Sequence, residues 1–141
     1  MAYREFERLS PNRDARAHER LGVLFHHSGL GFGETIVRMR DPLSKVSYHC
    51  LIDADGSRCT LVPDTEVAWH AGASRFMGRE RCNDFLIGVS FAGDTDVAPL
   101  TPAQVESRTK AERLTELAEL HDKGAITDEE LAAARARILA E

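Results

Sequence analysis

Short apolar runs, separated by segments that contain glycine and proline, dominate the first hundred residues and predict strands. Residues 22–27 (GVLFHH) and 84–93 (DFLIGVSFAG) are rich in β-branched and aromatic residues, which is typical of buried strands. The runs 46–53 and 57–63 flank the turn DADG, so they predict a β-hairpin in which Gly56 takes a positive φ. Apolar residues at helical spacing in 34–40 predict a helix between the first two strands.

The chain after residue 100 predicts two more helices. Thr101 and Gln104 form a T-x-x-Q capping box with proline at the first helical position, and Thr127 and Glu130 form a second capping box. Gly124 lies where the first of these helices would end. The order of elements predicts one sheet covered by helices, followed by a helical hairpin.

The composition shifts near residue 106, because no aromatic residue occurs from Ser107 onward. We therefore divide the chain into a mixed α/β domain, 1–106, and an α-helical hairpin, 107–141. A hairpin of this size buries too little apolar area to be stable alone, so it needs a partner surface, either its own domain or the same hairpin of another chain. A helix that runs unbroken from Thr101 into the tail would hold the hairpin away from its own domain, which favours pairing between chains.

Composition and charge exclude several classes of protein. Hydrophobic residues make up 43% of the 141 residues and the net charge is -5, which indicates a globular protein and argues against nucleic acid as a partner. No apolar run is long enough to span a membrane, and the charged start does not resemble a secretory signal. The three cysteines have no CxxC spacing, so we expect reduced thiols and a cytoplasmic location.

Histidines near strand ends are the candidate metal-binding or catalytic residues. His26 and His27 are neighbours on a strand, so they point to opposite faces and cannot bind one metal ion together. His49 follows Tyr48, and His70 follows a tryptophan. A single histidine at a strand end is more often a hydrogen-bonded structural residue than a ligand, and the spacing contains no H-E-x-x-H chelate. From the residues alone, a structural role and a site both stay open.

Five segments resemble one enzyme family: VLFHHSG, VSYHCLIDADGSRCTLVP, AWHAG, GRERCNDFLIGVSFAG and PLTPAQVES. They occur in the order found in type-2 N-acetylmuramoyl-L-alanine amidases, a group that includes bacterial cytosolic enzymes, phage enzymes and peptidoglycan recognition proteins. The resemblance spans about residues 8–106. It implies an α/β fold with a mixed β-sheet flanked by helices and a zinc ion in a groove. It also implies a hydrolase that cleaves the amide between N-acetylmuramic acid and the L-Ala of the peptidoglycan stem peptide.

The resemblance implies a role for individual residues. His26 is similar to the family's first zinc ligand, and Tyr48 is similar to a catalytic tyrosine that orients the zinc-bound water or stabilises the oxyanion. Arg81 is similar to an arginine whose planar fork of donors grips a stem-peptide carboxylate. The other substrate-binding residues that the resemblance implies lie along the groove: His27, Trp69, His70 and Asn83.

One part of the family pattern has no counterpart in this sequence. The second zinc-binding His, the Asp or Cys ligand and a catalytic Lys follow the family's last helix, and they are missing here. Catalytic zinc needs three protein ligands and an open position, so His26 alone cannot hold the ion. We therefore expect an amidase domain that is C-terminally truncated and inactive as an isolated chain. Two classes remain: a zinc amidase with ligands supplied from elsewhere, and a non-catalytic muropeptide-binding or oligomerisation module, that is, a pseudoenzyme.

The tail ERLTELAELHDKGAITDEELAAARARIL resembles the SHOCT (short C-terminal) domain, a helical hairpin of bacterial proteins linked to oligomerisation. Under this resemblance His121 lies at a helix C-terminus, facing the dipole. The alternative makes His121 a substitute zinc ligand with Asp128 and Glu129, although the family's neighbouring Lys is absent. We expect a homo-oligomer, most simply a dimer, through residues 107–141, held by apolar side chains that include Leu117, Leu120 and Leu139.

Overall fold

The structure is a computed structural model that describes residues 4–140. The side chains of residues 108–111 and 139 lie outside that description, and the role predicted for Leu139 lies outside it with them.

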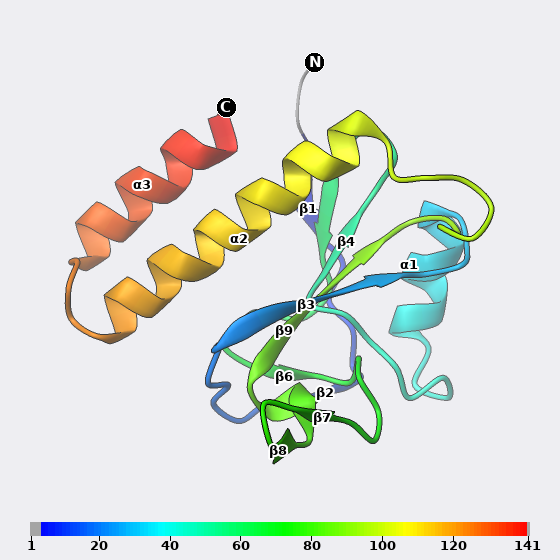
Figure 1. Cartoon of the computed structure of the whole chain (residues 1–141), viewed down its shortest axis with the longest axis horizontal. Helices are drawn as coiled ribbons and strands as arrows, with labels where there is room; N and C mark the ends of the chain where they lie inside the picture. The colour runs from blue at the N-terminus through cyan, green and yellow to red at the C-terminus, as the bar shows by residue number, and fades with distance from the viewer. Residues whose placement is uncertain (1–3, 141) are drawn as a thin grey trace.

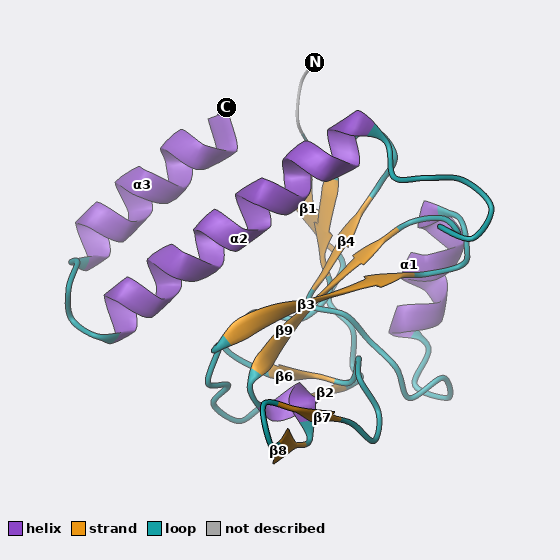
Figure 2. Ribbon diagram, viewed as in Figure 1, coloured by secondary structure: helices purple, strands orange, loops and turns teal. Residues whose placement is uncertain are grey.

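A five-stranded mixed sheet forms the centre of the molecule (Figures 1 and 2). Parallel pairing joins β3 to β9 and β9 to β4, β4 is antiparallel to β5, and β5 is parallel to β1. The predicted strands and the hairpin at Gly56 are confirmed. The strands lie in the spatial order β1 (Glu5–Glu7), β5 (Arg58–Thr60), β4 (Cys50–Ile52), β9 (Leu86–Phe91) and β3 (Gly22–His27).

Two short ribbons and a 3-10 helix lie at the end of the sheet where β3 and β9 begin (Figure 1). They were not predicted, because strands of two residues are too short to show an alternating pattern. Their bounds are β2 (Arg13–Asp14) with β6 (Val67–Ala68), β7 (Arg75–Phe76) with β8 (Arg79–Glu80), and the 3-10 helix Cys82–Asp84.

Helices cover both faces of the sheet (Figure 1). On one face lies α1 (Phe32–Arg40), which buries Thr35 and Met39. On the other lie α2 (Pro102–Asp122) and α3 (Asp128–Ala140). The α/β fold expected from the sequence is confirmed, with α1 beginning two residues before the predicted segment.

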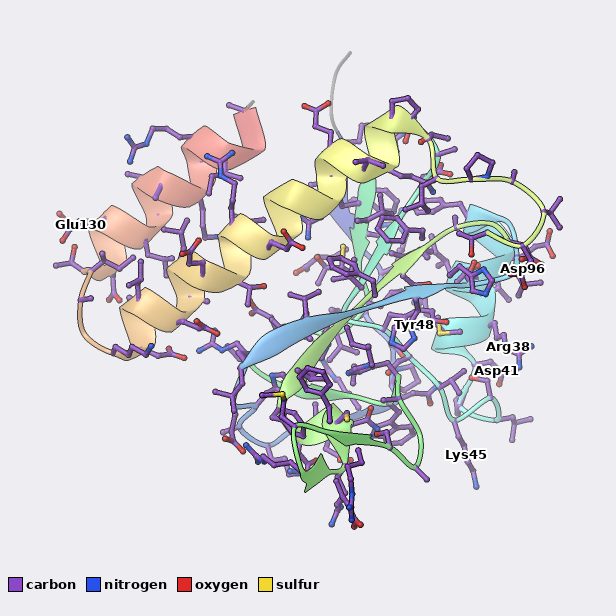
Figure 3. All side chains as sticks on the ribbon, viewed as in Figure 1. Arg38, Asp41, Lys45, Tyr48, Asp96 and Glu130 are labelled. Atoms are coloured by element: carbon purple, nitrogen blue, oxygen red, sulfur yellow. The ribbon has the colours of Figure 1, made fainter. Side chains whose placement is uncertain are left out.

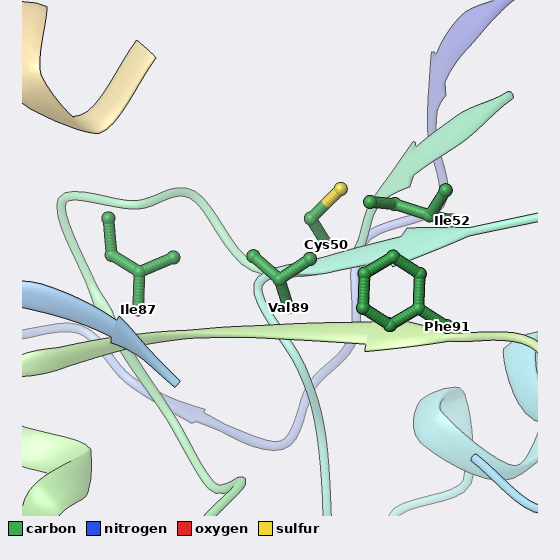
Figure 4. Packing of buried hydrophobic residues seen from close by; sticks show 5 residues of the cluster. All are labelled: Cys50, Ile52, Ile87, Val89 and Phe91. Carbon is green, nitrogen blue, oxygen red and sulfur yellow. The ribbon is translucent and has the colours of Figure 1, made fainter. Parts of the chain in front are cut away.

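The alternation of side chains along each strand divides the core between the two faces. Ile87, Val89 and Phe91 of β9 point to the α2 face, together with Cys50 and Ile52 of β4 (Figure 4). The residues between them in sequence point to the α1 face. Each strand therefore contributes to two separate packing layers.

The C-terminal hairpin has the predicted caps but not the predicted separation from its domain. Both capping boxes are present, since Thr101 accepts from the Gln104 N–H and Thr127 from the Glu130 N–H. The expected boundary at residue 106 falls inside α2, which is a single 21-residue helix. That long helix does not hold the hairpin away, because Leu114 is buried and lines a cavity with sheet residues. The expectation was wrong because α2 runs across the sheet instead of projecting from it.

The three cysteines are buried free thiols. Burial raises the pKa of Cys59 to about 11, so this thiol stays protonated at neutral pH. Within residues 4–140, no helix combines the length and apolar content that crossing a membrane requires.

Candidate functional site

Two histidines that are distant in sequence meet near the C-terminal end of β3. His26 belongs to β3 and His70 follows β6, and 3.1 Å separates His26 Nε2 from His70 Nδ1. The His70 ring lies against the backbone of β9, where a Cβ on Gly88 would stand 2.4 Å from His70 Cγ. The absence of a side chain at Gly88 therefore allows the two rings to meet.

The hydrogen bonds around this pair determine which nitrogens carry protons. His70 Nε2 lies 3.0 Å from the carbonyl oxygen of Leu86, which only accepts, so Nε2 is the donor. In a neutral ring His70 Nδ1 must then accept, and His26 Nε2 donates to it. His70 thus presents a lone pair on Nδ1 toward His26.

His49 continues the cluster into the interior. Its ring centroid lies 5.8 Å from that of His70. His49 Nδ1 accepts from the Gly88 N–H at 2.9 Å, and Nε2 donates to the Glu66 carbonyl at 2.8 Å. Both nitrogens of a neutral imidazole are therefore engaged.

His18 is the fourth member, with its ring centroid 5.1 Å from that of His49. It donates from Nε2 to the Leu86 carbonyl at 2.9 Å and accepts the Arg20 N–H at Nδ1. Sequence analysis did not select His18, because it precedes the first predicted strand in a polar segment.

Burial keeps these four imidazoles uncharged at neutral pH. Desolvation is the main reason that the pKa of His49 falls to about 3 and that of His70 to about 4. The pKa values of His18 and His26 are also lowered, again mainly by burial. Neutral imidazoles are the form that binds metal ions and accepts protons.

Tyr48 lies beside the histidine pair and borders a hollow of about 340 Å³, the Tyr48 hollow. The Tyr48 and His26 ring centroids are 5.3 Å apart. Trp69 and His70 line the same hollow, and the Trp69 indole N–H donates to Asp14. The full lining is Ser28, Gly29, Leu30, Thr35, Arg38, Met39, Val46, Tyr48, Trp69 and His70.

Arg38 is a lining residue that sequence reasoning missed. It projects from the exposed side of α1, on the same side of the molecule as Tyr48 (Figure 3). Arg81, the arginine selected from the sequence, borders a different hollow with Arg16 and lies 3.5 Å from Asp84. The structure therefore brings Arg38 to the Tyr48 hollow and places Arg81 elsewhere on the surface.

Asn83 and His27 also have defined places. The Asn83 side-chain oxygen accepts hydrogen bonds from the backbone N–H groups of His70 and Ala71. Asn83 therefore holds the backbone of the His70 segment in place. His27 points away from His26 and accepts the Thr95 N–H at 2.8 Å. Their predicted contacts with substrate stay predictions.

His26 Nε2 and His70 Nδ1 are the two side-chain nitrogens that could hold a zinc ion at this site. Two nitrogens in a tetrahedral zinc site lie about 3.3 Å apart, close to the 3.1 Å between His26 and His70. The Leu86 carbonyl already accepts a hydrogen bond from the other ring nitrogen of His70, an arrangement that commonly orients histidines that bind metal ions. Among residues 4–140, however, the one cluster of three potential ligand side chains is His27, Asp94 and Asp96 on the surface. The site around His26 therefore does not fit a complete catalytic zinc centre.

The tail does not complete the site. His121 and Asp128 hydrogen-bond to each other across the turn between α2 and α3. That turn lies at the opposite side of the molecule from the end of β3 (Figure 1). The pair therefore stabilises the hairpin, and the alternative that made these residues substitute zinc ligands is wrong for this fold.

Comparison with known proteins places this geometry among peptidoglycan amidases. A family model described as N-acetylmuramoyl-L-alanine amidase matches residues 16–136. The 1,6-anhydro-N-acetylmuramyl-L-alanine amidase AmpD of Escherichia coli is 52% identical over 62 residues, which are 44% of this chain and 33% of that protein. The N-acetylmuramoyl-L-alanine amidase AmiD of Escherichia coli is 33% identical over 121 residues, which cover 74% of this chain and 43% of that protein.

A solved structure supports the same relationship. AmiD from E. coli, in complex with the substrate anhydro-N-acetylmuramic acid-L-Ala-D-γ-Glu-L-Lys, superposes with a TM-score of 0.57 at 26% identity. The superposition covers 82% of this chain and 49% of that one. The matched segments thus span a third to a half of the length of AmpD and AmiD.

Proposed function

Because the chain belongs to the N-acetylmuramoyl-L-alanine amidase family, we propose that it binds muropeptides in the Tyr48 hollow and that residues 4–140 do not hydrolyse them unaided. The observation that carries this proposal is the His26–His70 pair beside Tyr48, which supplies two nitrogens where a catalytic zinc ion needs three ligands. Any activity would require a third ligand from outside the described residues.

The composition of the Tyr48 hollow supports a ligand with a sugar and a short peptide. Trp69 and Tyr48 offer aromatic surface against which a sugar ring or an alanine methyl group packs. Arg38 offers a guanidinium for a stem-peptide carboxylate. We also retain Arg81 as a candidate for this role, contacting a part of the peptide that extends beyond the hollow.

A titration of the full chain with anhydro-N-acetylmuramic acid-L-Ala-D-γ-Glu-L-Lys tests the binding. We expect saturable heat for the wild type and a loss of affinity of about 1.5–3 kcal/mol in Arg38→Gln, the range for a hydrogen bond to a charged group. Arg81→Gln is the matched arginine variant, with a smaller loss expected. No heat and no chemical-shift change at millimolar ligand would refute the proposed binding.

Metal analysis tests the ligand count separately. After equilibration with zinc and dialysis, the chain should retain well below one zinc ion per chain, because two imidazoles bind the ion weakly. One tightly held ion per chain, lost in both His26→Ala and His70→Ala, would show that a third ligand exists and would overturn this part of the proposal.

We further propose that the hairpin self-associates, as its SHOCT-like sequence suggests. A hollow of about 380 Å³ lies between α2 and α3, and Leu117 and Leu120 line it. Leu120 is 39% exposed, so apolar surface stays available. Light scattering after size exclusion should give a multiple of 15.6 kDa, whereas a monomer mass at tens of micromolar protein would refute self-association.

The buried free thiols support our proposal of a cytoplasmic location.

A further inference from the structure

On the α2 face of the sheet, opposite α1, a cavity of about 560 Å³ lies between the strands and the C-terminal hairpin. Its size falls within the range of small-molecule sites. We call it the arginine pocket, because Arg58 of β5 and Arg135 of α3 both line it. Apolar side chains form much of the remaining wall: Phe6, Val62, Pro63, Ile87, Val89 and Leu114.

Arg58 is buried without a counter-ion. The residue is 7% exposed, and its Nε donates to the Cys50 sulfur at 3.3 Å. Burial raises the pKa of the Cys50 thiol, so this acceptor is a neutral sulfur. Arg58 Nη1 is inaccessible to solvent and has no hydrogen-bond partner in the described part of the chain. An unpartnered donor on a charged group is among the most costly groups to bury.

The acidic residues near Arg58 do not neutralise it. Glu5 is the register partner of Arg58 on β1, and Glu7 and Asp64 also line the cavity. No ion pair joins any of these three carboxylates to Arg58 within residues 4–140. Glu5 and Glu7 are exposed and Asp64 is partly exposed, so all three stay hydrated at the rim of the cavity.

Arg135 adds a second positive charge. Burial, followed by the charge of Arg135, lowers the pKa of Arg58 to about 10, which leaves Arg58 protonated at neutral pH. Arg58 and Arg135 both line the cavity, so a bound anion could contact two guanidinium groups, whereas the lining carboxylates belong to partly or fully exposed side chains. A guanidinium presents parallel N–H donors that match the two oxygens of a carboxylate.

We propose that the arginine pocket binds a small monocarboxylate, with its carboxylate on Arg58 and its apolar body against Ile87, Val89 and Leu114. The carboxylate pairs with the part of the Arg58 guanidinium that lines the cavity, and the apolar body packs against the wall between the sheet and α2. The carboxylates of Glu5 and Asp64 at the rim disfavour a second negative charge on the ligand. This site lies on the opposite face from the histidine pair and does not depend on muropeptide binding.

The source of the carboxylate is either a short branched fatty acid or an apolar amino acid. Calorimetric titrations of the full chain with 4-methylpentanoate and with L-leucine distinguish them, because the two probes share one apolar body and differ by an ammonium group. Tighter binding of L-leucine would mean that the rim carboxylates contact the ammonium group, and tighter binding of 4-methylpentanoate would identify the fatty acid. Isopentylamine, which has the apolar body and no carboxylate, should not bind. Amine binding equal to carboxylate binding would overturn the proposal.

Arg58→Gln tests the assigned contact, and Arg75→Gln on the β7–β8 ribbon is the matched control. We expect at least a tenfold loss of carboxylate affinity in Arg58→Gln and no change in Arg75→Gln. Equal affinity in Arg58→Gln and the wild type would remove Arg58 from the site.

A second measurement uses only the wild type, in case Arg58→Gln does not fold. The Arg58 Nε–Hε resonance should shift when 4-methylpentanoate or L-leucine is added. If this resonance does not move at saturating concentrations of either probe, the pocket does not bind carboxylates through Arg58.

Discussion

The imidazoles of His18, His49 and His70 are buried as neutral rings with partners for their nitrogens, whereas Arg58, on the α2 face of the sheet, is buried with its charge. The histidines give up protons to become buried, since burial lowers their pKa values below neutrality. A guanidinium does not lose its proton in the same way. Arg58 therefore carries a charge for which the described residues provide no partner.

The buried histidines therefore have hydrogen-bond partners within the fold, whereas the buried guanidinium of Arg58 lacks one for Nη1 among the described residues. On the histidine side, removal of a ring leaves backbone groups unpaired, so substitutions should destabilise the fold. On the arginine side, removal of the charge eliminates an unsatisfied group, so a substitution should stabilise it. The four predictions below test this contrast.

His49→Leu should have the largest effect. The substitution leaves the Gly88 N–H and the Glu66 carbonyl without partners, at about 1–3 kcal/mol each. We expect the free energy of unfolding to fall by about 2–5 kcal/mol, measured by urea denaturation followed by Trp69 fluorescence. His27→Leu, at a side chain that is 37% exposed, should cost less than about 1 kcal/mol. Equal losses in the two variants would contradict the contrast.

Gly88→Ala should force the His70 ring off β9, since the new Cβ would be 2.4 Å from His70 Cγ. We expect a loss of about 2–3 kcal/mol, as in overpacked cores, and shifted imidazole NMR signals of His26 and His70. Gly33→Ala in α1 has no atom within 4 Å of the new Cβ, so it should be neutral or slightly stabilising. A Gly88→Ala protein as stable as the wild type would show that His70 does not lie against β9.

Acid should weaken the fold before the carboxylates titrate. The folded-state pKa values of His49 and His70, about 3 and about 4, lie below the ordinary value of 6.5. Below pH 6.5 the unfolded chain therefore binds protons that the folded chain does not bind, and stability falls with pH. We expect each of the two histidines to contribute a loss of about 2 kcal/mol between pH 7 and pH 5, measured by urea denaturation. Unchanged stability over this window would mean that these histidines are accessible to protons in the folded protein.

Arg58→Met should have the smallest effect and the opposite sign. Replacement of an unpartnered buried charge by an apolar side chain should raise the free energy of unfolding by about 1 kcal/mol. Thermal unfolding in ligand-free buffer measures it. Destabilisation comparable to that of His49→Leu would show that Arg58 has a partner within the chain, and the two faces would no longer differ.

The sequence predicted the parts of the fold that depend on local patterns. The bounds of β3 matched GVLFHH, and the T-x-x-Q and T-x-x-E capping boxes marked the starts of α2 and α3. The candidate sites were harder to predict from the sequence, because they depend on contacts between distant residues. Nothing local in AWHAG indicates that His70 turns onto Gly88, 18 residues later, and reaches His26. In the sequence, Arg58 likewise has no feature that distinguishes it from other strand residues. Its burial depends on α2 and α3, which pack over that part of the sheet.

The docking of α2 shows the same limit. The capping box at Thr101 and the glycine at position 124 indicated a helix but not which surface would cover its apolar side. The structure covers Leu114 with the sheet. Helix propensity and capping act within a few residues, whereas the choice of partner surface depends on the shape of the whole domain.

The central claim is that residues 4–140 provide a binding hollow and two zinc-capable histidines but not a complete catalytic centre. Mass spectrometry of anhydro-N-acetylmuramic acid-L-Ala-D-γ-Glu-L-Lys, incubated with the full chain and added zinc, tests this most directly. We predict no release of the free peptide above a protein-free control, at concentrations where titration shows the ligand bound. Zinc-dependent release of the peptide that disappears in both His26→Ala and Tyr48→Phe would contradict the account.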